Sequence, residues 1–165
     1  MSSPDSVGSA TKYDSGLSVY SGNSLFRKDL KPIALRAGQN FSGADITIPL
    51  TGMYTVQAQV KDAVTGKPLD VAQVQLMDAD GKETLRAQFV DDNGNCTSEY
   101  VPAGQYTLAV VNAMDLSGVG KILDKNYDPK KAVHYSAASV KVRVSGNTEG
   151  IVLQVSKPTP PKPAL

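Results

Sequence analysis

The stretch Tyr54-Thr-Val-Gln-Ala-Gln-Val-Lys-Asp62 decides the fold class, because apolar and polar residues alternate along it. Successive side chains of a strand point to opposite faces, so Tyr54, Val56, Ala58 and Val60 share one face of this predicted strand. The same alternation recurs in five later stretches, at residues 71–77, 85–89, 106–110, 140–144 and 150–155. Each predicted strand has one apolar face, and two sheets must pack face to face to bury it. The sequence therefore predicts an all-β sandwich.

The alternation also predicts which side chains face the core. In the stretch 85–89 it places Leu85, Ala87 and Phe89 on the inner face and turns Arg86 and Gln88 toward solvent. Large apolar side chains are buried far more often than charged ones. We therefore expect the apolar side chains of this strand to line the core, as those of the other strands do.

Short turn signals separate the predicted strands. Asp80-Gly81 and Asn93-Gly94 are typical two-residue hairpin turns, and Thr65-Gly66 supplies a residue that tolerates positive φ. Pro102-Ala-Gly104 predicts a tight corner, and the hydroxyl of Tyr106 is expected to reach back to the backbone there, as in a tyrosine corner. Together these signals favour an antiparallel Greek-key arrangement of the strands.

Two stretches of the chain resemble each other. Residues 33–50 and 140–155 each alternate apolar and polar residues, pause at a Gly-bounded turn and alternate again, as hairpins do. They lie about 107 residues apart, which is a domain-sized spacing. This spacing favours a hairpin remnant of a preceding module at residues 32–52 and a complete sandwich at residues 53–156. The alternative is two unrelated hairpins in one domain.

The two ends of the chain differ from the middle. Residues 1–31 are polar and irregular, and the sequence leaves open whether they form a disordered lead-in or a long loop. Residues 157–165 are rich in proline, which predicts an extended spacer or terminus. The start of the chain has neither a basic segment nor an apolar segment of the kind that signal peptides carry.

Composition limits the possible functions. The chain has 165 residues and a formal net charge of +1, so it has no electrostatic basis for binding nucleic acid or an acidic membrane. No apolar run approaches the roughly 20 residues that a membrane helix needs, so we expect no membrane insertion. One cysteine cannot form an internal disulfide framework.

Residues 54–112 resemble a known family, the carboxypeptidase regulatory-like domains. The resemblance lies in the pattern Val60-Lys-Asp62, Thr65-Gly66-Lys-Pro68-Leu69, Ala72-Gln-Val74-Gln-Leu76, Asp80-Gly81, Asp92-Asn-Gly94 and Val101-Pro102-Ala-Gly104-Gln-Tyr106-Thr-Leu108. It implies a prealbumin-like (transthyretin-like) β-sandwich. Residues 37–46 resemble the connector between such modules in large exported proteins of soil bacteria. The family implies an accessory, non-catalytic module of exported or cell-surface proteins, sometimes attached to peptidases, outer-membrane receptors or adhesins.

Candidate catalytic and metal-binding groups are sparse. The turns 78–81 and 91–94 carry oxygen ligands suited to Ca²⁺, but the full alternating loop is missing and turn chemistry explains their composition. Cys96 has no base near it in sequence, and a lone cysteine is usually a small buried hydrophobe. Transthyretin-like hydrolases would need several histidines, whereas His134 is the single one here. We expect no catalytic residue, no metal site and no cofactor.

The sequence thus favours a non-enzymatic, extracellular or cell-surface module that serves as a structural spacer or a protein-interaction and assembly domain. Its expected partners are other modules of the same protein, or a second copy bound through an edge strand. The alternative is a carbohydrate- or peptide-binding module that uses the loop 111–135. Tyr127, His134 and Tyr135 are the candidate binding residues of that loop, because long loops often carry function.

Overall fold

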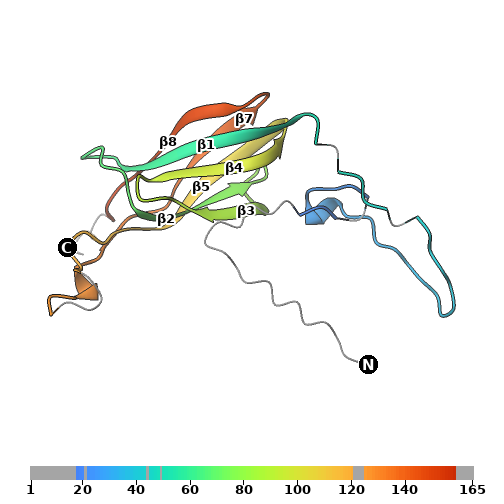
Figure 1. The fold of residues 1–165 in the computed structure, drawn as a ribbon, viewed down its shortest axis with the longest axis horizontal. Coiled ribbons are helices and arrows are strands. Elements are labelled where there is room, and N and C mark those ends of the chain that lie inside the picture. Colours follow the sequence, from blue (N-terminus) through green and yellow to red (C-terminus); the bar gives the residue numbers. More distant parts are fainter. Residues whose placement is uncertain (1–17, 21, 44, 49, 121–124, 159–165) are drawn as a thin grey trace, which may run out of the picture.

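The computed structural model describes residues 18–20, 22–43, 45–48, 50–120 and 125–158, and it confirms the predicted β-sandwich (Figure 1). The strands are β1 (Met53–Asp62), β2 (Val71–Met77), β3 (Thr84–Phe89), β4 (Asn95–Pro102), β5 (Gly104–Asp115), β6 (Val133–His134), β7 (Ala138–Val144) and β8 (Thr148–Val155). The helical segments of the described residues are two short 3₁₀ turns, η1 (Arg27–Asp29) and η2 (Pro129–Lys131). None of these segments is long and apolar enough to cross a membrane.

Two sheets enclose the core. One has three strands in the order β4-β1-β8, and the other has the order β3-β2-β5-β6, with β7 also paired to β5. The largest fully buried side chains come from both sheets and from the connection between β1 and β2: Val56, Val60, Leu69, Leu76, Val101, Leu108, Val110, Val144, Leu153 and Val155. The period-2 pattern of the sequence therefore found the inner faces of most strands.

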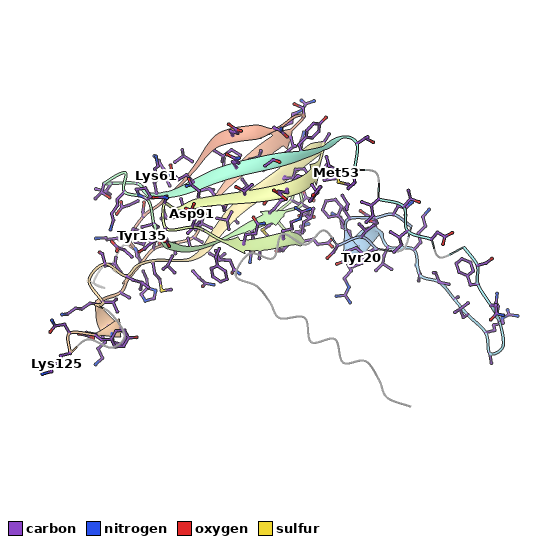
Figure 2. All side chains as sticks on the ribbon, viewed as in Figure 1. Tyr20, Met53, Lys61, Asp91, Lys125 and Tyr135 are labelled. Atoms are coloured by element: carbon purple, nitrogen blue, oxygen red, sulfur yellow. The ribbon has the colours of Figure 1, made fainter. Side chains whose placement is uncertain are left out.

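The pairing of β1 with β8 departs from the antiparallel arrangement that we expected. These two strands run parallel, with Ala58 opposite Ile151 and Asp62 opposite Val155. Because β1 is the first strand of the sandwich and β8 the last, the chain enters the fold at one end and leaves it at the other (Figure 1). Two labelled residues mark these ends of the sandwich, with Met53 at one end and Tyr135 at the opposite end (Figure 2).

The predicted turns are present, but only some of them connect paired strands. β2 and β3 form an antiparallel hairpin across the turn that contains Gly81. The turn at Asn93-Gly94 instead carries the chain from β3 in one sheet to β4 in the other, so its assignment as a hairpin was wrong. Gly94 has φ +74, and a Cβ there would lie 2.7 Å from the carbonyl oxygen of Val60. The turn is therefore held against β1, and a side chain would collide with that backbone.

The stretch 140–155 was also predicted as a hairpin, and that prediction was wrong. β7 pairs with β5, β8 pairs with β1, and the turn between them crosses from sheet to sheet. The alternation located both strands correctly, but it contains no information on which strand each will pair with. Sheet membership depends on contacts with β5 and β1, which lie far away in sequence.

The corner at Pro102 matches its prediction. Tyr106 is buried, and its hydroxyl donates a hydrogen bond of 3.0 Å to the carbonyl oxygen of Pro102. Burial raises the pKa of this phenol, so the hydroxyl stays protonated and remains a donor. The bond fixes the position at which the chain passes from β4 to β5 between the sheets.

The inward and outward faces of β3 are the reverse of those predicted. Arg86 and Gln88 are buried, whereas Phe89 is 45% exposed. Arg86 lies opposite Leu76 on β2, which places its side chain on the inner face. There it donates a hydrogen bond of 3.0 Å to the carbonyl oxygen of Tyr100 on β4. β3 and β4 are edge strands of the two sheets, and polar side chains that reach from one to the other close this side of the sandwich.

Candidate functional site

The three residues predicted as a binding surface do not form one cluster of exposed side chains. Tyr127 is exposed in the loop between β5 and β6, and His134 is exposed on β6. Tyr135 is half-buried, and its hydroxyl donates a hydrogen bond of 2.9 Å to the carboxylate of Asp62 at the end of β1. Tyr135 therefore ties the start of the last two strands to β1, which is a structural role.

That contact has an electrostatic signature. Burial, followed by the hydrogen bond to Asp62, raises the pKa of Tyr135 to about 12. The pKa of Asp62 is lowered, first by the backbone N–H of Val64 and also by the Tyr135 hydroxyl. A protonated phenol and an ionised carboxylate are the pair of states that this hydrogen bond requires.

The structure does not bring Cys96 and His134 together. Cys96 is buried on β4, at one edge of the three-stranded sheet, and it lies opposite Ala58 on β1. His134 lies on β6, and β2 and β5 separate that strand from β3, the edge strand beside β4. Burial raises the pKa of the Cys96 thiol to about 11, which disfavours the thiolate that a nucleophile needs.

The two acidic turns use their carboxylates internally. Asp91 accepts hydrogen bonds from the backbone N–H groups of Asn93 and Asn95. Asp78 accepts the N–H groups of Lys82 and Glu83 on one oxygen. Across the described part of the chain, no three His, Cys, Asp or Glu side chains gather in a way that suits a metal ion. Turn chemistry therefore accounts for these residues.

A cavity of about 300 Å³ lies along the β3–β4 edge, a site that the sequence did not indicate. Cys96 lines it, together with Gln88, Phe89, Asp91, Asn95, Thr97 and Glu99. The hydroxyl of Ser98 donates to the amide oxygen of Gln88 and so fixes one wall. Reversal of the faces of β3 produced this surface, because it exposes Phe89 and turns Gln88 inward.

Residues 18–20 and 22–29 pack against the sandwich near the turn between β2 and β3. The ammonium of Lys28 lies 2.8 Å from the carboxylate of Asp78, and Phe26 packs against the core. The backbone N–H of Arg27 donates to the carboxylate of Glu83. Hydrogen bonds from Lys28 and from two backbone N–H groups lower the pKa of Asp78 to about 2. The sequence left open whether residues 1–31 form a disordered lead-in or a long loop, and the described residues 18–20 and 22–29 form a docked segment. Residues 1–17 lie outside the described residues, as does most of the proline-rich tail.

Residues 32–50, called the arm below, form the second unusual surface. The arm leaves the sandwich at the end where β1 begins, extends away from it and returns (Figure 1). Its described residues contain no strand, so the hairpin pairing that we expected within 32–52 is absent. Six large apolar side chains on it are between 41% and 64% exposed: Ile33, Leu35, Phe41, Ile46, Ile48 and Leu50. Exposed apolar groups in such number make the arm a candidate interaction surface.

No protein-family model matches this chain, and no curated protein does. Among solved structures, it is similar to BcpA, the major pilin subunit of Bacillus cereus, at 13% identity and a TM-score of 0.44; the match covers 62% of this chain and 30% of the pilin. It is also similar to the 5-hydroxyisourate hydrolase of Klebsiella pneumoniae, at 17% identity, 65% and 93% coverage, and a TM-score of 0.41. A DUF3823 family protein from Parabacteroides merdae gives 18% identity, 64% and 46% coverage, and a TM-score of 0.40.

These similarities concern the fold alone. The chain spans about a third of the length of the pilin subunit that it matches. Its own strand order and corner define it as a two-sheet β-sandwich.

Proposed function

We propose that this chain is a non-catalytic β-sandwich module that serves as a structural spacer between other modules of the same protein. The parallel pairing of β1 with β8 carries the proposal, because it sends the chain in at one end of the sandwich and out at the other. The ends of a domain often lie close together, which would fold an array back on itself. The ten residues of β1 span about 33 Å at about 3.3 Å per residue, so each module extends the array by about that length.

The arrangement of reactive groups supports a role without catalysis. The one thiol is buried with a raised pKa, and the one imidazole lies beyond two intervening strands. The resemblance of residues 54–112 to carboxypeptidase regulatory-like domains supports placing the module outside the cell or on its surface. The exposed arm supports a contact with a further module or with a second copy of the chain.

The geometry is testable with two spin labels. Thr51→Cys and Lys157→Cys, in a Cys96→Ala background, place labels at the two ends of the sandwich, and their separation is measured by pulsed electron resonance. We expect one narrow distribution centred at about 30–45 Å. A short or broad distribution would contradict the spacer geometry. Light scattering coupled to size exclusion, over a range of concentrations, then tells whether the chain also self-associates.

A second candidate function is binding of a glycan or peptide, and the cavity on the β3–β4 edge favours it over the loop 111–135. An exposed aromatic ring beside amide and carboxylate groups is suited to a sugar, because the ring stacks on C–H groups while the polar groups bind hydroxyls. Phe89 would provide that ring. NMR titration with a panel of oligosaccharides tests this role. Binding that Phe89→Ala abolishes and Phe41→Ala preserves would support it.

A further inference from the structure

The arm and the last two strands of the sandwich align without a gap. Residues 33–48 match residues 140–155 at a constant offset of 107 positions. Three pairs are identical: Arg36 with Arg143, Asn40 with Asn147, and Gly43 with Gly150. Four pairs keep a large apolar side chain: Ile33 with Val140, Leu35 with Val142, Ile46 with Leu153, and Ile48 with Val155.

At this offset, inward positions of β7 and β8 correspond to apolar residues of the arm, and outward positions correspond to polar or small ones. Leu153 and Val155 are buried on β8, and Val140 and Val142 of β7 pack against the core. Each of these positions corresponds to an apolar residue of the arm. The arm residues that correspond to outward positions are polar or small: Ala34, Arg36, Asp45 and Thr47. A shift of one residue would turn every apolar side chain of a strand to the wrong face, so this register is specific.

The backbone of the arm resembles the β7–β8 connection rather than a hairpin. β7 and β8 are consecutive and antiparallel in direction, yet each pairs with another strand of its own sheet. The arm likewise reverses direction, with a hydrogen bond of 3.0 Å from the N–H of Gln39 to the carbonyl of Arg36, and no strand is assigned to its described limbs. Two strands built to lie in different sheets have no reason to pair with each other.

We propose that residues 33–48 are the last two strands of a preceding sandwich of this same architecture. In that sandwich the first limb would pair with a strand equivalent to β5, and the second limb with a strand equivalent to β1. The partner of the arm is therefore a β-sandwich with both of those edges open. This inference rests on the proposed spacer function and specifies how successive modules are joined. The four residues 49–52 separate the second limb from β1, so adjacent sandwiches lie nearly end to end.

The docking of residues 18–20 and 22–29 fits the same arrangement. This segment precedes the arm as the loop between β5 and β7 precedes β7. It is fastened to the following sandwich by the Lys28–Asp78 ion pair and by Phe26. In an array, that segment becomes a contact between one module and the next. The loop between β5 and β6, which carries Lys125 at the opposite end of the molecule, has the equivalent position for a following module (Figure 2).

A tandem variant tests the proposal directly. Residues 53–139 are joined to residues 33–165, which places the arm where β7 and β8 belong in an added upstream copy and keeps the offset of 107. Hydrogen exchange is followed by mass spectrometry for peptides that cover residues 33–48. We expect exchange there to be slower than in the full-length chain by at least about two orders of magnitude, because the amides enter two sheets.

The matched control is the same tandem variant with Ile46 and Thr47 exchanged and Leu35 and Arg36 exchanged. Its composition is unchanged, but Leu35 and Ile46, one inward residue from each limb, now occupy outward positions. Loss of protection in this control supports the proposal. Equal protection in both tandem variants overturns it. So does the absence of protection in both, provided that peptides from residues 53–110 of the added copy are themselves protected. The outcome is separate from the spacer geometry, because the labels at residues 51 and 157 report on the downstream sandwich alone.

A graft in the full-length chain covers the case in which the added copy fails to fold. Residues 140–155 are replaced by residues 33–48, so the arm sequence stands in a sandwich whose other six strands are native. We expect one cooperative urea transition and protected amides in the graft. The face-exchanged graft should instead lose the cooperative transition. If both grafts unfold alike, the arm is not an equivalent of β7 and β8.

Discussion

β7–β8 and the arm have the same pattern of residues and opposite environments. Leu153 on β8 is 1% exposed, whereas Ile46, its counterpart 107 positions earlier, is 49% exposed. β7 and β8 have β5 and β1 beside them, and the arm has no such edge within the described residues of this chain. The comparison shows that alternation of apolar and polar residues makes a stretch suited to form a strand. A neighbouring backbone and a core to cover decide whether it does.

The largest difference between the two regions should appear on truncation of matched side chains. Leu153→Ala removes a fully buried side chain, and we expect it to lower the free energy of unfolding by about 2–5 kcal/mol. Ile46→Ala should change it by less than about 0.5 kcal/mol, because its side chain has little to lose. Urea denaturation of both variants measures the two effects. Similar losses would mean that the arm packs on its own sandwich.

The second-largest effect should be a loss of stability at high pH, and it arises at the hydrogen bond between Tyr135 and Asp62. The pKa of Tyr135 is raised to about 12 from the ordinary value of 10.0, so its protonated form is favoured by folding. The resulting stabilisation is complete below pH 10 and is lost as the pH rises toward 12. Tyr135→Phe should weaken the dependence of stability on pH in that range. Urea denaturation at pH 9, 10 and 11 measures it, with Tyr127→Phe in the exposed loop as the control.

A smaller effect distinguishes the two turns. The side-chain oxygen of Asn147 accepts a hydrogen bond of 3.0 Å from the N–H of Thr55 on β1. Asn147→Ala should therefore lower the free energy of unfolding by about 1 kcal/mol. Asn40 is the counterpart in the arm, and Asn40→Ala should leave stability unchanged in this chain. In the tandem variant described above, Asn40→Ala should become destabilising, and the same result there as in the parent chain would weaken the equivalence.

The smallest effect concerns the docked segment. The lowered pKa of Asp78, about 2, means that its stabilising contribution is present above pH 4 and is lost as the pH falls toward 2. Asp78→Asn should reduce the slope of stability against pH in that range, and Asp80→Asn in the same turn should not. Lys28 is half-exposed, and ion pairs of that kind contribute little at neutral pH. An unchanged acid profile in Asp78→Asn would mean that Lys28 and the two backbone N–H groups do not together lower the pKa of Asp78.

Several features of the fold were predictable from local sequence. Period-2 alternation located β1, β2, β5, β7 and β8, because a buried inner face constrains every second residue. Gly-containing dipeptides located the turns, since they supply the positive φ that those turns need, as at Gly94. The Tyr106 bond to Pro102 followed from the short spacing between an aromatic residue and a corner.

The candidate functional surfaces were less predictable. The loop 111–135 was selected because it is long. Its residue Tyr135, however, donates its hydroxyl hydrogen bond to Asp62. The cavity on the β3–β4 edge depends on the reversed faces of β3. No local signal indicates that reversal, because Arg86 is stabilised on the inner face by Tyr100 of a different sheet. The arm, in contrast, is visible in the sequence as a repeat of residues 140–155.

The sequence by itself determined the strands β1, β2, β5, β7 and β8, the positions of the turns, and the corner, because each of these depends on residues close together in the chain. It also revealed the repeat of the arm, because the pattern within each copy is local. The tertiary structure alone decided that β3 and β4, like β7 and β8, belong to different sheets, that Arg86 faces inward, and that β1 and β8 run parallel. Those outcomes follow from competition among distant strands for edges and core, and only the assembled fold resolves it.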